Sequence, residues 1–374
     1  MSNPASPPNG EATWLLAWDS HGYHRTGTAG DRAGADWLTE KAQAFGAATA
    51  QETFTLDRLD PGDVYLEVDG TRIPGIPVFD APATSGVTGV LGTEIAVAAL
   101  GPGAVYTGEY RLLRQNAGHA GLVIQCSGAH PGMGLLNAEH FPTPYGAPAI
   151  HVDAAIPIGR SARLVSESLR TRTEARNVVV TLKGRDPSRP PVVVMTPRSS
   201  WWQSTAERGG GIVCWLETLR ALLAAPPACD VILTANSGHE LGHLGLDDFM
   251  ARRPGWDQAP GWDQANSAVW VHYGANIGAA GGALSVVSPD DGLRARMHNA
   301  LTAAGQPPDT MAPKDLVPSG ETRDIHRAGG RYVTLVGTNP WFHLPQDRFP
   351  HTVDVPAIAR VAAGAAQLVV GLTR

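Results

Sequence analysis

The sequence predicts an α/β protein with a mostly parallel central sheet flanked by helices and a smaller inserted domain rich in β-strands. The chain has 374 residues, which is long for one average domain. Continuous apolar segments alternate with helical patterns in its second half. Before them, short β-branched runs are separated by turns rich in Pro and Gly. We therefore expect an α/β domain at residues 1–58 and 162–374, interrupted by an inserted domain at residues 59–161.

The elements of the α/β domain follow from local patterns. Apolar residues recur at helical spacing from Thr28 to Gly46, and Gly46 is a typical helix stop. A strand is expected next, at Ala50 to Leu56. The later predicted elements are, in chain order, strands at 177–184, 190–197 and 230–236 with a helix near 211–225, a helix from about residue 239, strands at 267–274 and 329–337, and a helix at 355–372.

Composition and charge narrow the classes of partner. The net charge is −6 and no run of Lys or Arg occurs, which argues against nucleic acid and against an anionic membrane surface. We find neither a secretory leader pattern nor eighteen consecutive apolar residues, so the expected location is the cytoplasm. The three cysteines, at unrelated spacings, are expected to be reduced thiols. A small-molecule or short peptide-like substrate fits best.

The most specific local motif is H-E-L-G-H at residues 239–243. On a helix, histidines at i and i+4 share a face and can bind one zinc ion, with the intervening glutamate activating water. The context is unusual for such a metalloprotease, because an apolar strand precedes the motif and Gly242 lies within it.

A combined site explains more of the histidines. The strand before His239 ends at the sheet edge where α/β folds place their ligand crevice, and other candidate ligands follow other strands. Several imidazoles with a carboxylate suit a single catalytic zinc that keeps an open position for water. The candidate metal ligands are Glu207, His239, His243, His272 and His343. Glu240 is either a further ligand or the catalytic base. Alternatively the pocket is free of metal and His239 is itself the general base.

Several segments together resemble the zinc-dependent aminopeptidase family, which also includes glutamate carboxypeptidase-like enzymes and glutaminyl cyclases. The similarity spans nearly the whole chain and implies the fold given above. NAGHAGLVIQCSG and YGAPAIHVD, within 59–161, look like a protease-associated domain. The other segments are HRTGTAGDRAGADWLTEKAQAFG, NVVVTLKGRDPSRPPVVVMTPRSSWW, GGGIVCWLETLRALL, ILTANSGHELGHLG and NPWFHLPQDRFPHTVD.

The resemblance also implies that part of a two-metal site has been lost. The family's first histidine falls at Pro197 and the neighbouring aspartate at Ser199. Its later aspartate falls near Ala275, a loss for which His272 is a candidate substitute. The general-base glutamate is replaced by His239. The positions that keep a ligand type are Glu207 for the bridging aspartate, Glu240 and His343.

Other residues are candidates for substrate binding. Arg198 could bind a substrate carboxylate, while Trp201 and Trp202 could form a pocket wall. Glu321 lies where the family often has an acidic residue near its pocket. The hexapeptide PGWDQA occurs twice between residues 254 and 265, as a surface duplication or as a lid carrying Trp256 or Trp262.

Three functional hypotheses follow. The first is a hydrolase of an amide or peptide-like bond that uses one divalent metal, expected to be zinc. The second is a metal-free descendant that acts as a binding protein or an acid–base enzyme through the same crevice. The third is an ordinary two-zinc aminopeptidase. The inserted domain is expected either to cover the crevice or to form a contact between subunits of a homo-oligomer.

Overall fold

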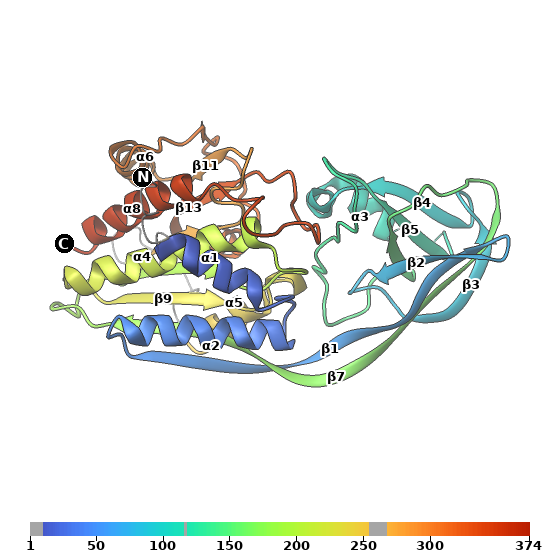
Figure 1. Ribbon diagram of the computed structural model, residues 1–374, viewed down its shortest axis with the longest axis horizontal. Coiled ribbons are helices and arrows are strands. Elements are labelled where there is room, and N and C mark those ends of the chain that lie inside the picture. The colour runs from blue at the N-terminus through green and yellow to red at the C-terminus, as the bar shows by residue number, and fades with distance from the viewer. Residues whose placement is uncertain (1–9, 116–117, 254–267) are drawn as a thin grey trace, which may run out of the picture.

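The computed structural model describes residues 10–115, 118–253 and 268–374, and it confirms the predicted α/β fold class. Figure 1 shows a large lobe, in which helices cover a central sheet, joined to a smaller lobe by two long strands. The two PGWDQA copies, with Trp256 and Trp262, lie outside the described residues, so their predicted role as a lid stays a prediction.

The sheet of the large lobe is parallel at its centre. Strand β10 pairs in parallel with both β8 and β13, and β8 pairs in parallel with β9. Antiparallel strands flank this group, with β11 beside β13 and β7 beside β9. In spatial order the strands are β12 (Thr310–Met311), β11 (Leu284–Val287), β13 (Arg331–Gly337), β10 (Val269–Tyr273), β8 (Val192–Pro197), β9 (Val231–Asn236), β7 (Ser161–Leu182) and β1 (Thr49–Val68).

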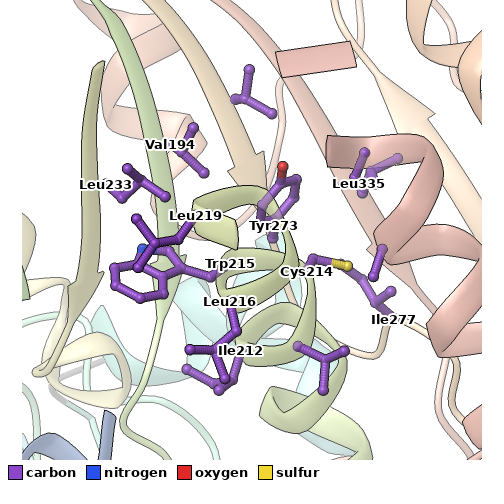
Figure 2. Packing of buried hydrophobic residues seen from close by; sticks show 14 of the residues in the cluster. Val194, Ile212, Cys214, Trp215, Leu216, Leu219, Leu233, Tyr273, Ile277 and Leu335 are labelled. Atoms are coloured by element: carbon purple, nitrogen blue, oxygen red, sulfur yellow. The ribbon is translucent and has the colours of Figure 1, made fainter. Parts of the chain in front are cut away.

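Both faces of this sheet are buried, as the continuous apolar strands predict. Along β8, Val192 and Val194 belong to one hydrophobic cluster, whereas Val193 and Met195 belong to another. Figure 2 shows the first cluster, in which Leu216 and other side chains of α4 pack against the sheet. The helices of this lobe are α1 (Gly10–Ser20), α2 (Ala29–Ala44), α4 (Gly210–Ala224), α5 (Leu244–Ala251), α6 (Asp291–Ala303), α7 (Thr322–Arg327) and α8 (Val355–Leu372).

In the smaller lobe the strand order continues from β1 through β2, β6, β5 and β4, and two hydrophobic clusters lie there. The long strands β1 and β7 pair over almost their whole lengths and run from one lobe to the other (Figure 1). The expected domain limits near residues 59 and 161, and the likeness to a protease-associated domain, stay predictions. The remaining elements are β2 (Thr71–Pro77), β3 (Thr84–Val90), β4 (Ile95–Leu100), the short helix η1 (Pro102–Tyr106), α3 (Gly108–Gln115), β5 (Gly121–Cys126) and β6 (Ala149–Val152).

Local sequence signals explain where several elements begin and end. Helix α2 begins after Thr28, whose hydroxyl accepts a hydrogen bond from the backbone N–H of Asp31. Soon after the helix, Gly46 adopts a positive φ of 93°, the conformation that glycine tolerates best. The expected strand at Ala50–Leu56 forms part of the longer β1. All three cysteines are free, as expected.

Helix α8 is long and apolar enough to cross a membrane by length and composition alone. Half of it is buried within the protein, and residues such as Ile358 and Val361 join the core shared with α4. These contacts are typical of the core helix of a folded domain.

Replacing a buried leucine of the central sheet tests this packing. Leu233→Ala on β9 removes a fully buried side chain and is expected to lower the free energy of unfolding by about 2–5 kcal/mol, because it leaves a cavity. Leu169→Ala on β7 is the matched control, since Leu169 is 71% exposed and a change within about 0.5 kcal/mol is expected. Chemical denaturation measures both, and equal losses would contradict the assigned core.

Candidate functional site

Candidate residues gather at the carboxyl ends of the parallel strands. Strands β8, β9 and β10 are neighbours that run in the same direction, so the loops after Pro197, Asn236 and Tyr273 meet at one edge of the sheet. The loop after β8 leads to Glu207, and the loop after β9 carries His239 and its neighbours. The large lobe thus places its polar loops where α/β folds bind ligands.

The predicted helix beginning near His239 is wrong. Residues His239–Leu241 form a single 3₁₀ turn, and α5 begins only at Leu244. Gly242 and His243 have positive φ values of 81° and 71°, which interrupt the helix between the two histidines. The rings still come together, with centroids 5.0 Å apart, but a turn brings them there and not the face of a helix.

Glu240 stabilises this turn. One carboxylate oxygen accepts a hydrogen bond from the backbone N–H of Thr26 at 2.7 Å, and the other accepts one from the hydroxyl of Ser199 at 2.6 Å. The Ser199 hydroxyl in turn accepts a hydrogen bond from the backbone N–H of His239. Burial raises the pKa of Glu240. We therefore revise its expected role as metal ligand or base, because both oxygens already hold the fold together.

A second group lies at the start of α4. Glu207 sits on a turn of π-helix at Thr205–Gly209 and is fully buried. Its Oε1 lies 2.6 Å from Nη2 of Arg208 and 3.2 Å from Nε2 of His343. The ring of His343 is held from its other side, where Nδ1 lies 2.6 Å from the carbonyl oxygen of Leu135. We call Glu207, Arg208 and His343 the arginine-paired cluster.

The charge of Arg208 dominates this cluster. Burial alone would raise the pKa of Glu207, but the charges of Arg208 and His343 outweigh it and lower that pKa to about 2. Glu207 is therefore an ionised carboxylate whose charge is already compensated by a guanidinium. This arrangement argues against the predicted roles of Glu207 and His343 as ligands of a further cation.

A third group forms around His239. Two loops and the end of β10 supply a group that we call the histidine cluster. It consists of His239 and His243 from the loop after β9, Glu321 from the loop before α7, and His272 from β10. Each is at most 6% exposed. Four of their polar atoms are buried and have no hydrogen-bond partner among the described residues, namely Nδ1 of His239, Nε2 of His243, Nε2 of His272 and Oε1 of Glu321. The first and the last of these atoms are 3.7 Å apart.

In His243 and His272 the second ring nitrogen, Nδ1, has a hydrogen-bond partner. Nδ1 of His243 lies 2.6 Å from a carboxylate oxygen of Asp324, and Nδ1 of His272 lies 2.5 Å from the hydroxyl of Thr322. The Asp324 carboxylate favours a proton on Nδ1 of His243, which leaves its Nε2 as a free lone pair. Glu321 accepts a hydrogen bond from Asn236 through its second oxygen, at 3.3 Å.

Burial and nearby positive charge keep His239 and His272 neutral. Burial, followed by the charge of Arg208 and of the other histidines, lowers the pKa of His239 well below its usual value. Burial, with His243 and Arg208, lowers the pKa of His272 to about 3. Burial raises the pKa of Glu321 to about 7, although His243 and Arg208 oppose the shift. Neutral imidazoles with exposed lone pairs are the form that binds metal ions.

A cavity of about 210 Å³ opens beside the histidine cluster, and we call it the inner cavity. His239 and His272 form its polar wall, and Val287, Val336 and Phe342 contribute apolar surface. Its size suits a small group of a substrate, and its lining combines apolar walls with a few polar groups, as is common in ligand sites.

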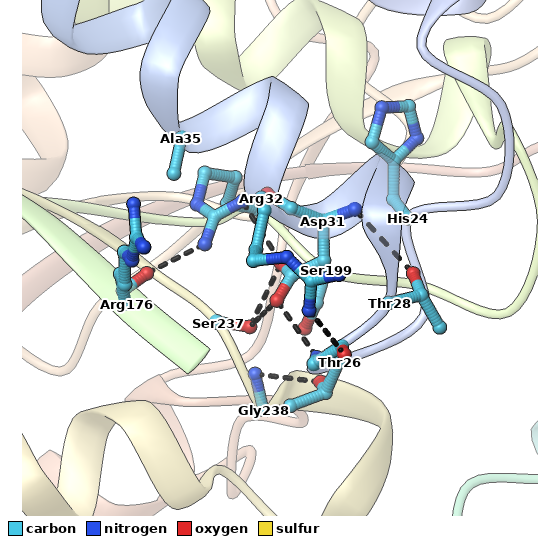
Figure 3. A network of polar contacts seen from close by, with 12 residues as sticks. His24, Thr26, Thr28, Asp31, Arg32, Ala35, Arg176, Ser199, Ser237 and Gly238 are labelled. Carbon is cyan, nitrogen blue, oxygen red and sulfur yellow. Dashed lines mark hydrogen bonds and ion pairs between the residues drawn. The ribbon is translucent and has the colours of Figure 1, made fainter. Parts of the chain in front are cut away.

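The three residues of the loop after β8 that we expected to bind substrate all have contacts within the protein, and their predicted role stays a prediction. Arg198 is fully buried, and its Nη1 lies 2.9 Å from a carboxylate oxygen of Asp31. The same Nη1 also donates to the backbone carbonyl group of Asp31, and Nη2 donates to that of Arg176. Figure 3 shows Asp31 within a network of polar contacts. Trp201 is 2% exposed and stacks on Phe79 in the core. The indole of Trp202 donates to the carbonyl group of His343.

Substitution of Arg198 distinguishes these roles. Arg198→Met leaves the Asp31 carboxylate buried without its cation, so the free energy of unfolding should fall by about 3–5 kcal/mol. The control Arg72→Met removes an exposed arginine of an ion pair and should cost at most about 1 kcal/mol. Denaturation curves measure both. Weaker substrate binding with unchanged stability in Arg198→Met would restore the predicted carboxylate-binding role.

The most important residue that sequence reasoning missed is Arg208. Its position directly after Glu207 was visible, but nothing in the pattern indicated that its guanidinium turns inward. Asp324 and Thr322, which hold two of the histidines, were also missed, although both lie beside the predicted Glu321.

The residues at the positions where the family resemblance implied metal ligands do not form a two-metal site. Pro197 has no side-chain ligand atom and neither does Ala275, while Glu240 and Glu207 are engaged as described above. Within the part of the chain that the structure describes, no three His, Cys, Asp or Glu side chains already stand together in a metal-binding arrangement. Four buried atoms of the histidine cluster lack a hydrogen-bond partner among the described residues. Both carboxylate oxygens of Glu207 and Nε2 of His343 lack one as well, but there the ion pair with Arg208 compensates the charge of the carboxylate.

Comparison with known proteins identifies solved structures that share the fold. No family model and no curated protein matches the sequence. Among solved structures, a zinc aminopeptidase from Bacillus subtilis is similar with a TM-score of 0.77 and 16% identity, over 100% of this chain and 97% of that one. An aminopeptidase from Aneurinibacillus sp. strain AM-1 is similar with a TM-score of 0.72 and 13% identity, over 96% of this chain and 92% of that one. Glutaminyl cyclase from Porphyromonas gingivalis is similar with a TM-score of 0.50 and 12% identity, over 97% of both chains. The chain therefore has the zinc aminopeptidase-like fold.

Proposed function

We propose that this protein hydrolyses an amide or peptide-like bond in a small substrate with the help of one divalent metal ion, zinc, at the histidine cluster. The fold supports a hydrolase, because several solved structures that share it are peptidases by name. The position of the cluster, at the carboxyl ends of β9 and β10, supports a ligand site.

The observation that carries the proposal is the set of four buried atoms without partners. Leaving a buried donor or acceptor unpaired costs about 1–3 kcal/mol per group. Three imidazole nitrogens and one carboxylate oxygen are ligand atoms that zinc prefers, so a single ion would compensate all four. Small movements of the side chains would be needed to bring the four atoms to zinc.

The contacts behind the rings support the same assignment. Histidines that bind metal ions almost always use their second nitrogen to contact a carboxylate, a carbonyl group or water. His243 makes such a contact with Asp324, and the Thr322 hydroxyl holds His272 in a similar way. A zinc ion in this place polarises a carbonyl group and lowers the pKa of bound water.

The surrounding residues have roles of their own. The apolar wall of the inner cavity, including Phe342 and Val336, orients the substrate and excludes water from the bond to be cleaved. Arg208 supplies a fixed positive charge, which acts on His239, His272 and Glu321 and stabilises negative charge that develops in the transition state. Its Nη2 is paired with Glu207 at 2.6 Å, whereas its Nη1 has no hydrogen-bond partner among the described residues.

A metal-free reaction is the second candidate, and one contact favours it. Nδ1 of His239 lies 3.7 Å from Oε1 of Glu321, so the two groups would have to approach to hydrogen-bond distance before they exchange a proton. In this case His239, which lines the inner cavity, acts as the general base, and no metal ion takes part.

Metal content decides between the two candidates. Elemental analysis of the protein dialysed against zinc and then against buffer should give about one zinc per chain. His272→Gln should reduce this number to near zero, because it removes one of the proposed ligands. The matched control His343→Gln removes a buried histidine of the arginine-paired cluster and should retain the metal.

The opposite results are equally informative. Equal metal loss in both variants would place the ion elsewhere. Wild-type protein without zinc, together with amide hydrolysis that a chelator leaves unchanged, would establish the metal-free reaction. Circular dichroism of each variant checks that lost metal does not reflect an unfolded chain.

A further inference from the structure

We propose that Glu139 of the smaller lobe is a positioning residue for the histidine cluster. It holds the guanidinium group of Arg323 away from Asp324, which leaves the carboxylate of Asp324 free to orient the ring of His243. This inference rests on the proposed function, because the cluster that Glu139 would influence is the proposed zinc site.

Glu139 lies on a segment that is anchored to the smaller lobe. Residues 127–148 connect β5 to β6, which are both strands of that lobe. Within this connection, the backbone N–H of His140 donates a hydrogen bond to a carboxylate oxygen of Asp80 at 2.9 Å. Asp80 is in turn paired with the buried Arg114 of α3. The side chain of Glu139 therefore starts from a fixed part of the smaller lobe.

The backbone of the same segment contacts the larger lobe beside the site. The backbone N–H of Ala138 donates a hydrogen bond to the carbonyl oxygen of Glu240 at 2.8 Å. Gly242 permits the close approach, because a Cβ atom at this position would lie only 3.1 Å from the carbonyl oxygen of Glu139. These contacts fix Glu139 relative to the turn that carries His243.

Arg323, on α7, is the partner of Glu139 across the two lobes. Its Nη1 lies 2.5 Å from Oε2 of Glu139, and the two side chains are only 14% and 18% exposed, so water screens this ion pair less than a surface pair. Nε of Arg323 has no hydrogen-bond partner among the described residues and lies 3.7 Å from Oδ1 of Asp324. The guanidinium group thus lies between two carboxylates and is closely paired with only one of them.

Asp324 links this ion pair to the histidine cluster. Its second oxygen, Oδ2, lies 2.6 Å from Nδ1 of His243. A carboxylate in this place orients the ring of a metal-binding histidine and makes its other nitrogen a stronger ligand. Without the charge of Glu139, Asp324 would be the nearest carboxylate to Arg323, and the guanidinium group would move toward it.

Two effects of that movement act in the same direction. A guanidinium group bonded to Asp324 would weaken this carboxylate as the acceptor for Nδ1 of His243. It would also bring a positive charge closer to a cation bound by the cluster. Arg327 lies 3.9 Å from the same Oδ1 of Asp324, but its side chain is 65% exposed, so its contact is weak. Glu139 therefore favours zinc binding although it does not touch the metal site.

Zinc affinity, measured by isothermal titration of the full chain with zinc, tests the inference. We expect Glu139→Gln to bind zinc about tenfold more weakly. The double variant Glu139→Gln, Arg323→Gln should return to within about twofold of the wild type, because no guanidinium group is left to approach Asp324. Arg323→Gln alone should also retain the wild-type affinity. The matched control Glu52→Gln breaks the ion pair with Arg253, whose side chains are similarly buried at 17% and 16%, and should leave zinc binding unchanged.

The ring of His243 provides a second readout that needs no metal. Nitrogen NMR of zinc-free protein labelled at its histidines reports which ring nitrogen carries the proton, and the signals that disappear in His243→Gln assign this ring. We expect the proton on Nδ1 in the wild type and in the double variant. In Glu139→Gln a larger fraction of the molecules should carry it on Nε2, because the acceptor at Nδ1 is weaker.

Unchanged zinc affinity and an unchanged His243 ring in Glu139→Gln would overturn the inference. A double variant as weak as Glu139→Gln would do so too, since Glu139 would then act only by joining the lobes. The NMR result separates this inference from the proposed function. A wild type that binds no zinc, with a His243 proton that shifts in Glu139→Gln and returns in the double variant, would support the role of Glu139 and contradict the metal-dependent hydrolase.

Discussion

The buried guanidinium of Arg208 beside Glu207 is the constraint on which the rest of the site depends. It lies on the loop between β8 and α4, in contact with the one carboxylate at the start of that helix. Because a guanidinium never loses its proton, this positive charge is permanent. It compensates Glu207 and repels protons from His239 and His272. Glu207 is thus paired, while His239 and His272 stay neutral, and a zinc ion at the proposed site would have to bind despite this nearby positive charge.

The same edge of the sheet carries residues that stabilise the fold and residues of the proposed metal site. Ser199 and Glu240 form hydrogen bonds that fix the turn carrying His239, where the family resemblance implied ligands. Helix α7 brings Glu321 and Thr322 to the histidine cluster and turns Arg323 toward the smaller lobe. We infer that metal binding would depend on the position of this one short helix.

Much of the fold was predictable from the sequence, and less of the site. Apolar runs such as Val192–Met195 can only be buried on both faces of a sheet, so the pattern determines the architecture. The turn at His239 was predicted wrongly, since the left-handed conformation of His243 follows from tertiary contacts and not from residue type. The spacing of residues in the sequence does not show whether a long side chain points into the protein or toward solvent. For this reason the burial of Arg198 was not predicted and Arg208 was not recognised as part of the site.

A zinc ion at the histidine cluster is tested most directly by anomalous diffraction at the zinc edge, from crystals of the full chain grown with zinc. We expect one peak, bounded by Nδ1 of His239, Nε2 of His243, Nε2 of His272 and Oε1 of Glu321 at about 2.0–2.2 Å. A peak between Glu207 and His343, or an empty histidine cluster in zinc-grown crystals, would contradict the proposed metal centre.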